Sequence, residues 1–209
     1  MNRGKFITFE GNDGSGKTTI SKLVFEELQA QGIPVVFTRE PGGIEIAEQI
    51  RTIILDPKNT GMDARTEALL YAASRRQHLV EKILPALEAG THVICDRFID
   101  SSLAYQGMGR SIGIKEVYEM NLFATQGCLP DLTLFLDVSV EEAMKRMEGR
   151  GNKDRLDQEN DAFHQRVRLG YEMVKKRYPQ RIHVIDAQQS ITEVKDACLE
   201  EIERILAHV

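Results

Sequence analysis

A glycine-rich loop that joins an apolar run to a helical segment constrains the fold of this chain more than any other feature. Residues 9–19 read FEGNDGSGKTT, which puts Gly11, Gly14 and Gly16 within six positions, directly before a helical stretch. Glycine loses more conformational freedom on folding than any other residue, so three in one loop indicate a backbone that closely approaches something else. The order of strand, glycine loop and helix is typical of an α/β fold.

Apolar runs and helical segments alternate along the rest of the chain. Short strands are expected at residues 6–10, 34–40, 92–96, 132–138 and 181–186. Helices are expected at residues 17–31, 44–55, 65–89, 114–125, 140–148 and 192–207, with one more that ends near residue 177. Pro85 is expected to kink or divide the third of these, and residues 96–110 are expected to be polar and flexible. Strands that are apolar throughout and separated by helices indicate a parallel sheet covered on both faces. We therefore predict an α/β fold with a five-stranded parallel sheet.

Composition narrows the class of protein. The 209 residues suit one domain, residues 1–209. The net charge of −5 argues mildly against non-specific nucleic-acid binding, and no apolar stretch approaches the ~20 residues that cross a bilayer. The first residues do not resemble a signal peptide. Cys95, Cys128 and Cys198 are scattered without metal-ligand spacing, and Cys95 is expected in the core. We expect a reduced, cytoplasmic protein that binds neither nucleic acid nor membrane.

The glycine loop matches the phosphate-loop pattern G-x-x-x-x-G-K-[ST] from Gly11 to Thr18. In this pattern the backbone N–H groups and the start of the following helix converge on phosphate oxygens. Lys17 would bridge the β- and γ-phosphates of a nucleotide. A dinucleotide fingerprint fits less well, because a threonine replaces its third glycine. The residues expected to bind ATP are Gly11, Asn12, Asp13, Gly14, Ser15, Gly16, Lys17, Thr18 and Thr19.

A Mg²⁺ cofactor follows from the same motif. The Thr18 hydroxyl would ligate the ion. Asp96 and Asp137 each end an apolar strand on the edge where parallel sheets bind ligands, so either could hold Mg²⁺ directly or through water. Asp96 is the first choice, because Asp137 could equally be an ordinary turn residue. Glu40, at the end of another strand, could also help to place the metal or a water molecule.

Three further stretches resemble one family closely. TREPGG (residues 38–43), YAASRR (71–76) and DRFIDSSLAYQG (96–107) accompany the phosphate loop in the same order as in thymidylate kinases of bacterial type. The resemblance covers nearly the whole chain. It implies a P-loop NTPase fold of the nucleoside monophosphate kinase kind, transfer of the γ-phosphoryl group of ATP to dTMP, and the homodimer common in the family.

The resemblance also implies a site for dTMP. Tyr71 and Arg75 are four residues apart and share one helix face, where an aromatic ring and a guanidinium suit a planar base. From the pattern alone, Tyr71 could equally belong to a core stripe. In the family, the corresponding residues stack on thymine and hydrogen-bond to it, and Ser102 and Gln106 resemble the pair that reads the pyrimidine edge. The residues expected to bind dTMP are Asp13, Glu40, Arg51, Tyr71, Arg75, Arg97, Ser102 and Gln106.

Basic residues are expected to supply catalytic charge. Arg97, next to Asp96, would bind the acceptor phosphate, since a guanidinium matches phosphate oxygens. Arg51 is a weaker candidate for this task, and Arg39 is more simply a surface ion-pair residue. The predicted catalytic residues are Lys17, Arg97, Arg150 and Arg155.

Two of those arginines lie in an expected lid. Some family members carry an arginine in the phosphate loop where this chain has Gly14, so the missing charge must come from elsewhere. A basic stretch (Arg146, Arg150, Lys153 and Arg155) matches the bacterial lid pattern, with the lid at about residues 149–157. Arg150 and Arg155 are expected to close over the phosphates of ATP. The alternative is a solvated, charged helix end.

Two other functions stay open at this point. A deoxynucleoside kinase also reads a pyrimidine, but it would phosphorylate thymidine and need no cationic pocket for a monophosphate. A nucleotide-gated binding module would hydrolyse nucleotide slowly without any acceptor.

Overall fold

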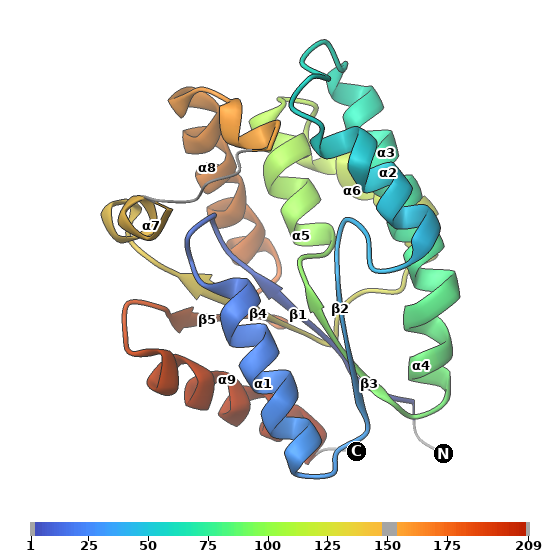
Figure 1. The fold of residues 1–209 in the computed structure, drawn as a ribbon, viewed down its shortest axis with the longest axis vertical. Coiled ribbons are helices and arrows are strands. Elements are labelled where there is room, and N and C mark those ends of the chain that lie inside the picture. The colour runs from blue at the N-terminus through green and yellow to red at the C-terminus, as the bar shows by residue number, and fades with distance from the viewer. Residues whose placement is uncertain (1–2, 148–153, 208–209) are drawn as a thin grey trace.

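The fold is built on one sheet in which every strand runs in the same direction. The computed structural model describes residues 3–147 and 154–207. The strands are β1 (Phe6–Glu10), β2 (Val35–Arg39), β3 (His92–Asp96), β4 (Leu132–Asp137) and β5 (Ile182–Asp186). They pair in parallel in the order β2-β3-β1-β4-β5 (Figure 1). The predicted five-stranded parallel sheet is confirmed, and β1 lies at its centre.

Helices cover both faces of this sheet. The regular helices are α1 (Lys17–Ala30), α2 (Glu45–Leu55), α3 (Ala64–His78), α4 (Leu84–Glu88), α5 (Ile99–Ser102), α6 (Ile114–Thr125), α7 (Val140–Met147), α8 (Asp161–Arg177) and α9 (Ile191–Leu206). Two π-helical turns, η1 (Leu79–Ile83) and η2 (Leu103–Gly109), and a 3₁₀ turn, η3 (Leu156–Gln158), complete the set among the described residues.

Two apolar cores hold the layers together. Since side chains alternate along a strand, Phe6 and Ile7 of β1 face opposite sides of the sheet. Phe6 packs in the core formed with η1, α4, α5, η2, α6 and α8, and Ile7 packs in the core formed with α1 and α9. Cys95 lies fully buried in the first core, as predicted.

The predicted helix over residues 65–89 forms with one irregularity. The chain is helical from α3 through η1 to α4, and Pro85 stands at the start of α4. Proline has no N–H and its ring crowds the carbonyl four residues earlier. The π turn at residues 79–83 lies directly before this point, and the helical path continues to Glu88.

The prediction for residues 96–110 is wrong, because this segment is helical and largely buried. After β3 ends, α5 and η2 run directly into one another. Ile99 and Leu103 pack in the core, while Ser101 and Ser102 between them line a cavity described below. Gly170 of α8 permits the close packing, since a Cβ there would lie 2.9 Å from the Cα of Ala104. The polar residues belong to a site and do not mark a loop.

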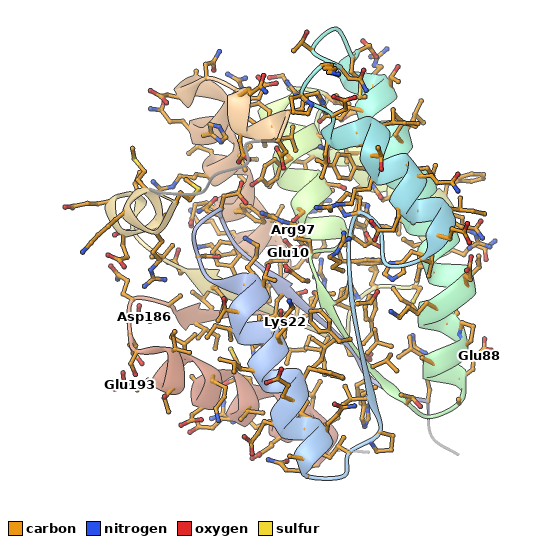
Figure 2. All side chains as sticks on the ribbon, viewed as in Figure 1. Glu10, Lys22, Glu88, Arg97, Asp186 and Glu193 are labelled. Carbon is orange, nitrogen blue, oxygen red and sulfur yellow. The ribbon has the colours of Figure 1, made fainter. Side chains whose placement is uncertain are left out.

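The carboxyl ends of the strands meet at one edge of the sheet. Glu10 and Arg97 lie near the middle of the molecule at this edge, whereas Glu88, Asp186 and Glu193 lie at its periphery (Figure 2). Glu10 is fully buried. Within the described residues, no helix combines the length and the hydropathy that a membrane span requires.

Candidate active site

The loop after β1 has the backbone that its glycines predicted. Gly11, Gly14 and Gly16 have φ values of 146°, 82° and 88°, in the region that side chains disfavour. No side chain caps the N-terminus of α1, so its first N–H groups face the loop without a side-chain partner. The Lys17 ammonium donates to the Asn12 carbonyl over 2.9 Å and lies within the loop. This arrangement suits an anion with several oxygens.

Gly14 is also required by packing. A Cβ at this position would lie 2.4 Å from the carbonyl oxygen of Ala143 in α7. A longer side chain, such as that of arginine, could not be accommodated here without moving α7. Any guanidinium charge beside the loop must therefore come from other elements.

Burial changes the protonation of the loop lysine. Lys17 is almost fully buried, and this desolvation, together with the nearby positive charge of Arg97, lowers the pKa of its ammonium to about 8. A bound polyanion would favour the charged form again.

Thr18 and Asp96, which were predicted to hold Mg²⁺, are in contact with each other. The Thr18 hydroxyl donates to Asp96 Oδ2 over 2.5 Å, and Asp96 Oδ1 is buried without a hydrogen-bond partner among the described residues. An unpaired buried carboxylate oxygen is costly unless a ligand completes it. Two protein oxygens suit Mg²⁺, which keeps waters and phosphate oxygens as its other ligands. Asp137 is exposed and does not line the cavity, so the geometry favours Asp96.

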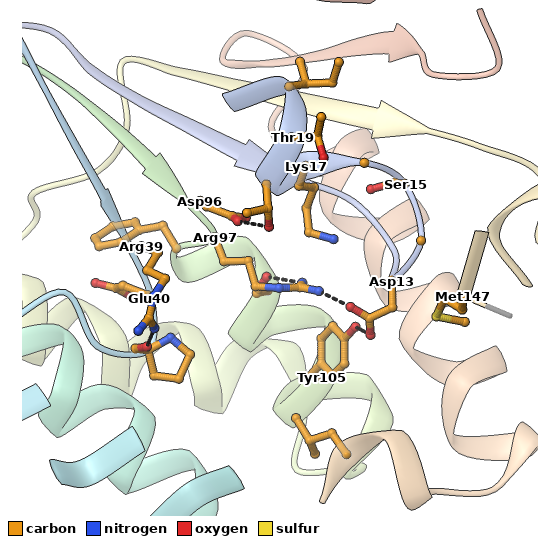
Figure 3. Close-up of a pocket in the computed structure, with 18 of the residues that line it drawn as sticks. Asp13, Ser15, Lys17, Thr19, Arg39, Glu40, Asp96, Arg97, Tyr105 and Met147 are labelled. Atoms are coloured by element: carbon orange, nitrogen blue, oxygen red, sulfur yellow. Dashed lines mark hydrogen bonds and ion pairs between the residues drawn. The ribbon is translucent and has the colours of Figure 1, made fainter. Parts of the chain in front are cut away.

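Arg97 stands between this loop and the rest of the site. Its φ of 69° is unusual for a non-glycine residue and matches the strain often found at functional positions. Its guanidinium pairs with Asp13 (Figure 3) and donates to the hydroxyls of Ser101 and Tyr171. The other oxygen of Asp13 accepts from Tyr105 over 2.7 Å. These contacts hold the guanidinium in one orientation beside the phosphate loop.

Glu10, which no sequence motif indicated, shares two hydrogen-bond partners, Ser101 and Tyr171, with Arg97. It accepts hydrogen bonds from the backbone of Phe98 and Ser101 and from the Ser101 and Tyr171 hydroxyls. Burial, and then the charge of Asp100, raises its pKa to about 7. Its position at the end of β1 was the only signal for a role, and its partners come from residues far along the chain.

One cavity of about 860 Å³ joins the predicted residues. The phosphate loop from Asp13 to Thr19 lines one part of it. Other lining residues that the sequence predicted are Glu40, Arg51, Tyr71, Arg75, Asp96, Arg97, Ser102 and Gln106. The volume falls within the usual range for ligand pockets. Arg97 lines the cavity together with both groups, so the two predicted sites share one space.

Arg75 is held in this cavity by a buried polar network. It is only 2% exposed; its Nε donates to Glu40 over 2.7 Å, and its Nη1 donates to Ser102 and Asn121. The second Glu40 oxygen lies 3.0 Å from His78 Nδ1. Nη2 of Arg75 has no partner among the described residues. Glu40 therefore contacts the arginine, and that arginine keeps one amino group for a ligand.

The remaining predicted arginines differ in their surroundings. Arg39 is partly exposed and forms a bidentate pair with Glu48, which confirms the predicted surface ion pair. Arg51 donates to the Pro41 carbonyl over 2.9 Å, and burial and Arg39 lower its pKa. Arg146 lines the cavity and donates to Glu142 and to the Ala187 carbonyl.

Of the two expected lid arginines, the structure describes only Arg155. Arg150 lies outside the described residues, as does Lys153. Arg155 is 4% exposed and donates to the Ile54 carbonyl and to Glu67, so in this conformation it does not face the phosphate loop as we expected. Glu67 is four residues before Tyr71 on the same helix face, a spacing that could have marked it.

Comparisons with known proteins agree with this geometry. A family model described as thymidylate kinase matches residues 9–198. The chain is similar to a thymidylate kinase of Oceanobacillus iheyensis, with 54% identity over 97% of this chain and 91% of that protein. It is 57% identical to a thymidylate kinase of Enterococcus faecalis over 96% of both chains.

A solved structure of a thymidylate kinase has a similar fold. The crystal structure of thymidylate kinase from Ehrlichia chaffeensis superposes with a TM-score of 0.78 and 36% identity. The match covers 96% of this chain and 99% of that one.

Proposed function

The chain belongs to the thymidylate kinase family and transfers the γ-phosphoryl group of ATP to dTMP, and we propose that the cavity of about 860 Å³ holds both nucleotides during the transfer. The phosphate loop binds ATP, and the part of the cavity lined by Tyr71 and Arg75 binds dTMP. The products, dTDP and ADP, lead into dTTP synthesis.

The continuity of the cavity carries this assignment. Lys17 and Thr18 line it with Tyr71, Arg75 and Arg97. Phosphoryl transfer needs donor and acceptor phosphates close together and in line, with their charges neutralised. Asp13 of the loop pairs with Arg97, and this contact supports a role for the Arg97 guanidinium in binding the acceptor phosphate near the γ-phosphate.

The residues of the loop supply binding and charge. Backbone N–H groups and the Lys17 ammonium bind the β- and γ-phosphates, and the charge on Lys17 stabilises negative charge that develops during transfer. Thr18 and Asp96 would hold Mg²⁺, which supplies further charge neutralisation when it is bound. Arg150 remains our proposed lid cation for the ATP phosphates.

The other end of the cavity suits thymine. Tyr71 offers an aromatic face, and Nη2 of Arg75 is available to a base carbonyl. Asp13, Arg51 and Arg97 also line this cavity, which supports our proposal that Asp13 contacts the sugar and that the two arginines bind the acceptor nucleotide.

Tyr71→Ala is expected to raise KM for dTMP about 10- to 100-fold, because base–aromatic stacking contributes ~1–3 kcal/mol. KM for ATP should change little. Tyr71→Phe keeps the ring and serves as the matched control. Steady-state kinetics with each substrate varied in turn measure both effects, and unchanged KM for dTMP in Tyr71→Ala would place the base elsewhere.

A panel of acceptors tests the whole assignment. With ATP and Mg²⁺ we expect rapid phosphorylation of dTMP, slower reaction with other nucleoside monophosphates, and none with thymidine. Turnover of thymidine alone would indicate a deoxynucleoside kinase. ATP consumption that does not depend on any acceptor would indicate a nucleotide-gated module.

The metal site has its own test. Asp96→Asn is expected to raise the Mg²⁺ concentration needed for half-maximal activity by about 10- to 100-fold, because the amide replaces the anionic oxygen that lacks a protein partner. Titration of activity with Mg²⁺ measures this, with Asp137→Asn at the exposed end of β4 as the matched control. Equal Mg²⁺ dependence in both variants would rule out Asp96.

We also propose that the protein forms a homodimer. Phe123 of α6 is 89% exposed and Leu69 of α3 is 58% exposed, and these two helices pack against each other. Large exposed apolar side chains on adjoining helices favour a two-fold interface.

The three free cysteines, two of them buried, support the expected reducing cytoplasm. The protein acts as one domain, since both cores pack on a single sheet.

Phe123→Asp is expected to weaken dimer formation by at least about 30-fold, since a buried aromatic anchor typically contributes about 2 kcal/mol or more. Analytical ultracentrifugation of a dilution series measures this. Leu169→Asp on α8 is the control, because Leu169 is also an exposed apolar residue but lies on another helix. A monomeric wild-type protein would contradict the proposal directly.

A further inference from the structure

A buried carboxylate at the base end of the cavity has no role in the function described so far. Glu67 on α3 is fully buried and receives hydrogen bonds from three side chains. Gln106 Nε2 donates over 2.8 Å, Arg110 Nε over 3.0 Å, and Arg155 Nη2 over 2.6 Å. Burying a carboxylate costs several kcal/mol unless it is paired, and here two guanidinium groups pair with it.

The positions of these residues follow a repeated spacing. Glu67, Tyr71 and Arg75 are four apart on one helix, so they share a face. Ser102 and Gln106 are four apart on the segment opposite. Two hydrogen bonds connect these segments: Arg75 donates to Ser102, and one helical turn or two away Gln106 donates to Glu67. The proposed stacking residue, Tyr71, lies between these two bonds in the helix sequence.

Glu67 determines which end of the Gln106 amide faces the cavity. A carboxylate flanked by two guanidinium groups accepts hydrogen bonds and has no proton to donate. Gln106 must therefore turn its NH₂ group toward Glu67. Its Oε1 has no partner among the described residues, and Gln106 lines the cavity. The base consequently meets a hydrogen-bond acceptor.

An acceptor at this point distinguishes pyrimidines by their protonation. Thymine carries a hydrogen on N3 and would donate to Gln106 Oε1. Cytosine has an unprotonated N3. Its lone pair would face a lone pair of Gln106 Oε1, and two acceptors without a hydrogen between them repel each other. A site that leaves its own polar atom unpaired rejects a ligand more strongly than one that merely misses an apolar contact.

We propose that Glu67 is a positioning residue that makes the cavity selective for dTMP over dCMP by fixing the Gln106 amide. Arg155 and Arg110 both pair with this carboxylate and so hold it in place. Arg155 also donates to the Ile54 carbonyl, and so joins the end of α2 to the same cluster. The proposal rests on the assignment of this cavity to dTMP.

Glu67→Gln tests the proposal, because the two side chains have the same shape. The arginines would keep the oxygen of the introduced amide, which leaves its NH₂ group for Gln106. Gln106 would then turn its own oxygen toward that group and present NH₂ to the base. The ratio of kcat/KM for dTMP to that for dCMP is expected to fall about 10- to 100-fold.

A double variant separates this role from general support of the fold. In Glu67→Gln combined with Gln106→Glu, the new amide donates to the new carboxylate, whose other oxygen again faces the base as an acceptor. Preference for dTMP should return relative to Glu67→Gln alone. Glu200→Gln is the matched control, since Glu200 is an exposed carboxylate that also pairs with an arginine. Its selectivity should equal that of the wild type.

The outcomes are separable. If wild type does not phosphorylate dTMP, the assignment of the cavity fails. If wild type does so and folded Glu67→Gln keeps its selectivity, the role of Glu67 is overturned. Should Glu67→Gln not fold, hydrogen exchange of the Gln106 side-chain amide in wild type decides the matter, with its NMR signal identified by its loss in Gln106→Leu. Slow exchange with and without dTMP supports the proposal, and fast exchange in the dTMP complex overturns it.

Discussion

Lys17→Ala is expected to lower kcat by at least about 100- to 1000-fold and to leave the protein folded. The Lys17 ammonium lies inside the phosphate loop, only 2.9 Å from the Asn12 carbonyl, where it can contact the phosphates that carry the developing charge. Its burial excludes water, which strengthens that electrostatic interaction. Steady-state kinetics with saturating ATP and dTMP measure the loss.

Lys22→Ala is the matched control for this prediction. Lys22 lies five residues further along α1, and its side chain is exposed to solvent away from the loop (Figure 2). Its kcat should be unchanged. Circular dichroism should show the same helix content in both variants. A kcat for Lys17→Ala within tenfold of wild type would mean that the loop does not hold the transferred phosphoryl group.

Arg75→Met is expected to lower the free energy of unfolding by about 3–5 kcal/mol, which is the usual cost of removing one partner from a buried ion pair. Glu40 would keep its contact with His78 but lose the guanidinium charge, and Ser102 and Asn121 would lose a donor. Urea unfolding followed by circular dichroism measures the change. KM for dTMP should rise in the same variant if the protein stays folded.

Two further variants show whether the unpaired charge of Glu40 causes the loss of stability in Arg75→Met. Arg76→Met, on the next position of α3, removes an arginine that makes one weak bond to the Ala124 carbonyl, and should cost less than about 1 kcal/mol. Adding Glu40→Gln to Arg75→Met removes the buried charge and should recover part of the stability. If Arg75→Met and Arg76→Met were equally stable, the buried pair would contribute nothing.

The phosphate loop illustrates what can be predicted from local pattern. Its glycines, its lysine and its threonine act within one short segment, so the order of residues specifies the backbone that binds phosphate. The parallel sheet was predictable for a similar reason, since continuous apolar strands need helices on both faces. The resemblance to thymidylate kinases then indicated Tyr71 and Arg75, which the structure brings to the same cavity as the loop.

The helical segment after β3 could not be recognised in this way. Its polar residues and glycines resemble those of a loop when they are read alone. In the fold, Ser102 and Gln106 are buried because they bond to Arg75 and Glu67 of another helix. Local composition does not report such partners.

The position of Arg155 likewise could not be predicted from its neighbours in the sequence. Its place in a basic stretch favoured a role above the ATP phosphates. Its guanidinium is instead bonded to Glu67, which lies 88 positions earlier in the chain. A basic side chain pairs with an anion that the fold brings close to it. The spacing of two residues in the sequence does not give the distance between their side chains in the folded protein.

The order of residues was sufficient for the parallel sheet and the phosphate loop, because each depends on short-range backbone preferences or on a contiguous motif. The class of reaction followed from the resemblance to thymidylate kinases over nearly the whole chain. The orientation of Arg97, the burial of Glu10 and the pairing of Glu67 with Gln106 depend on contacts between distant segments. Hydrogen bonds and ion pairs form over about 3 Å, so these features became defined only when the strands and helices were packed together.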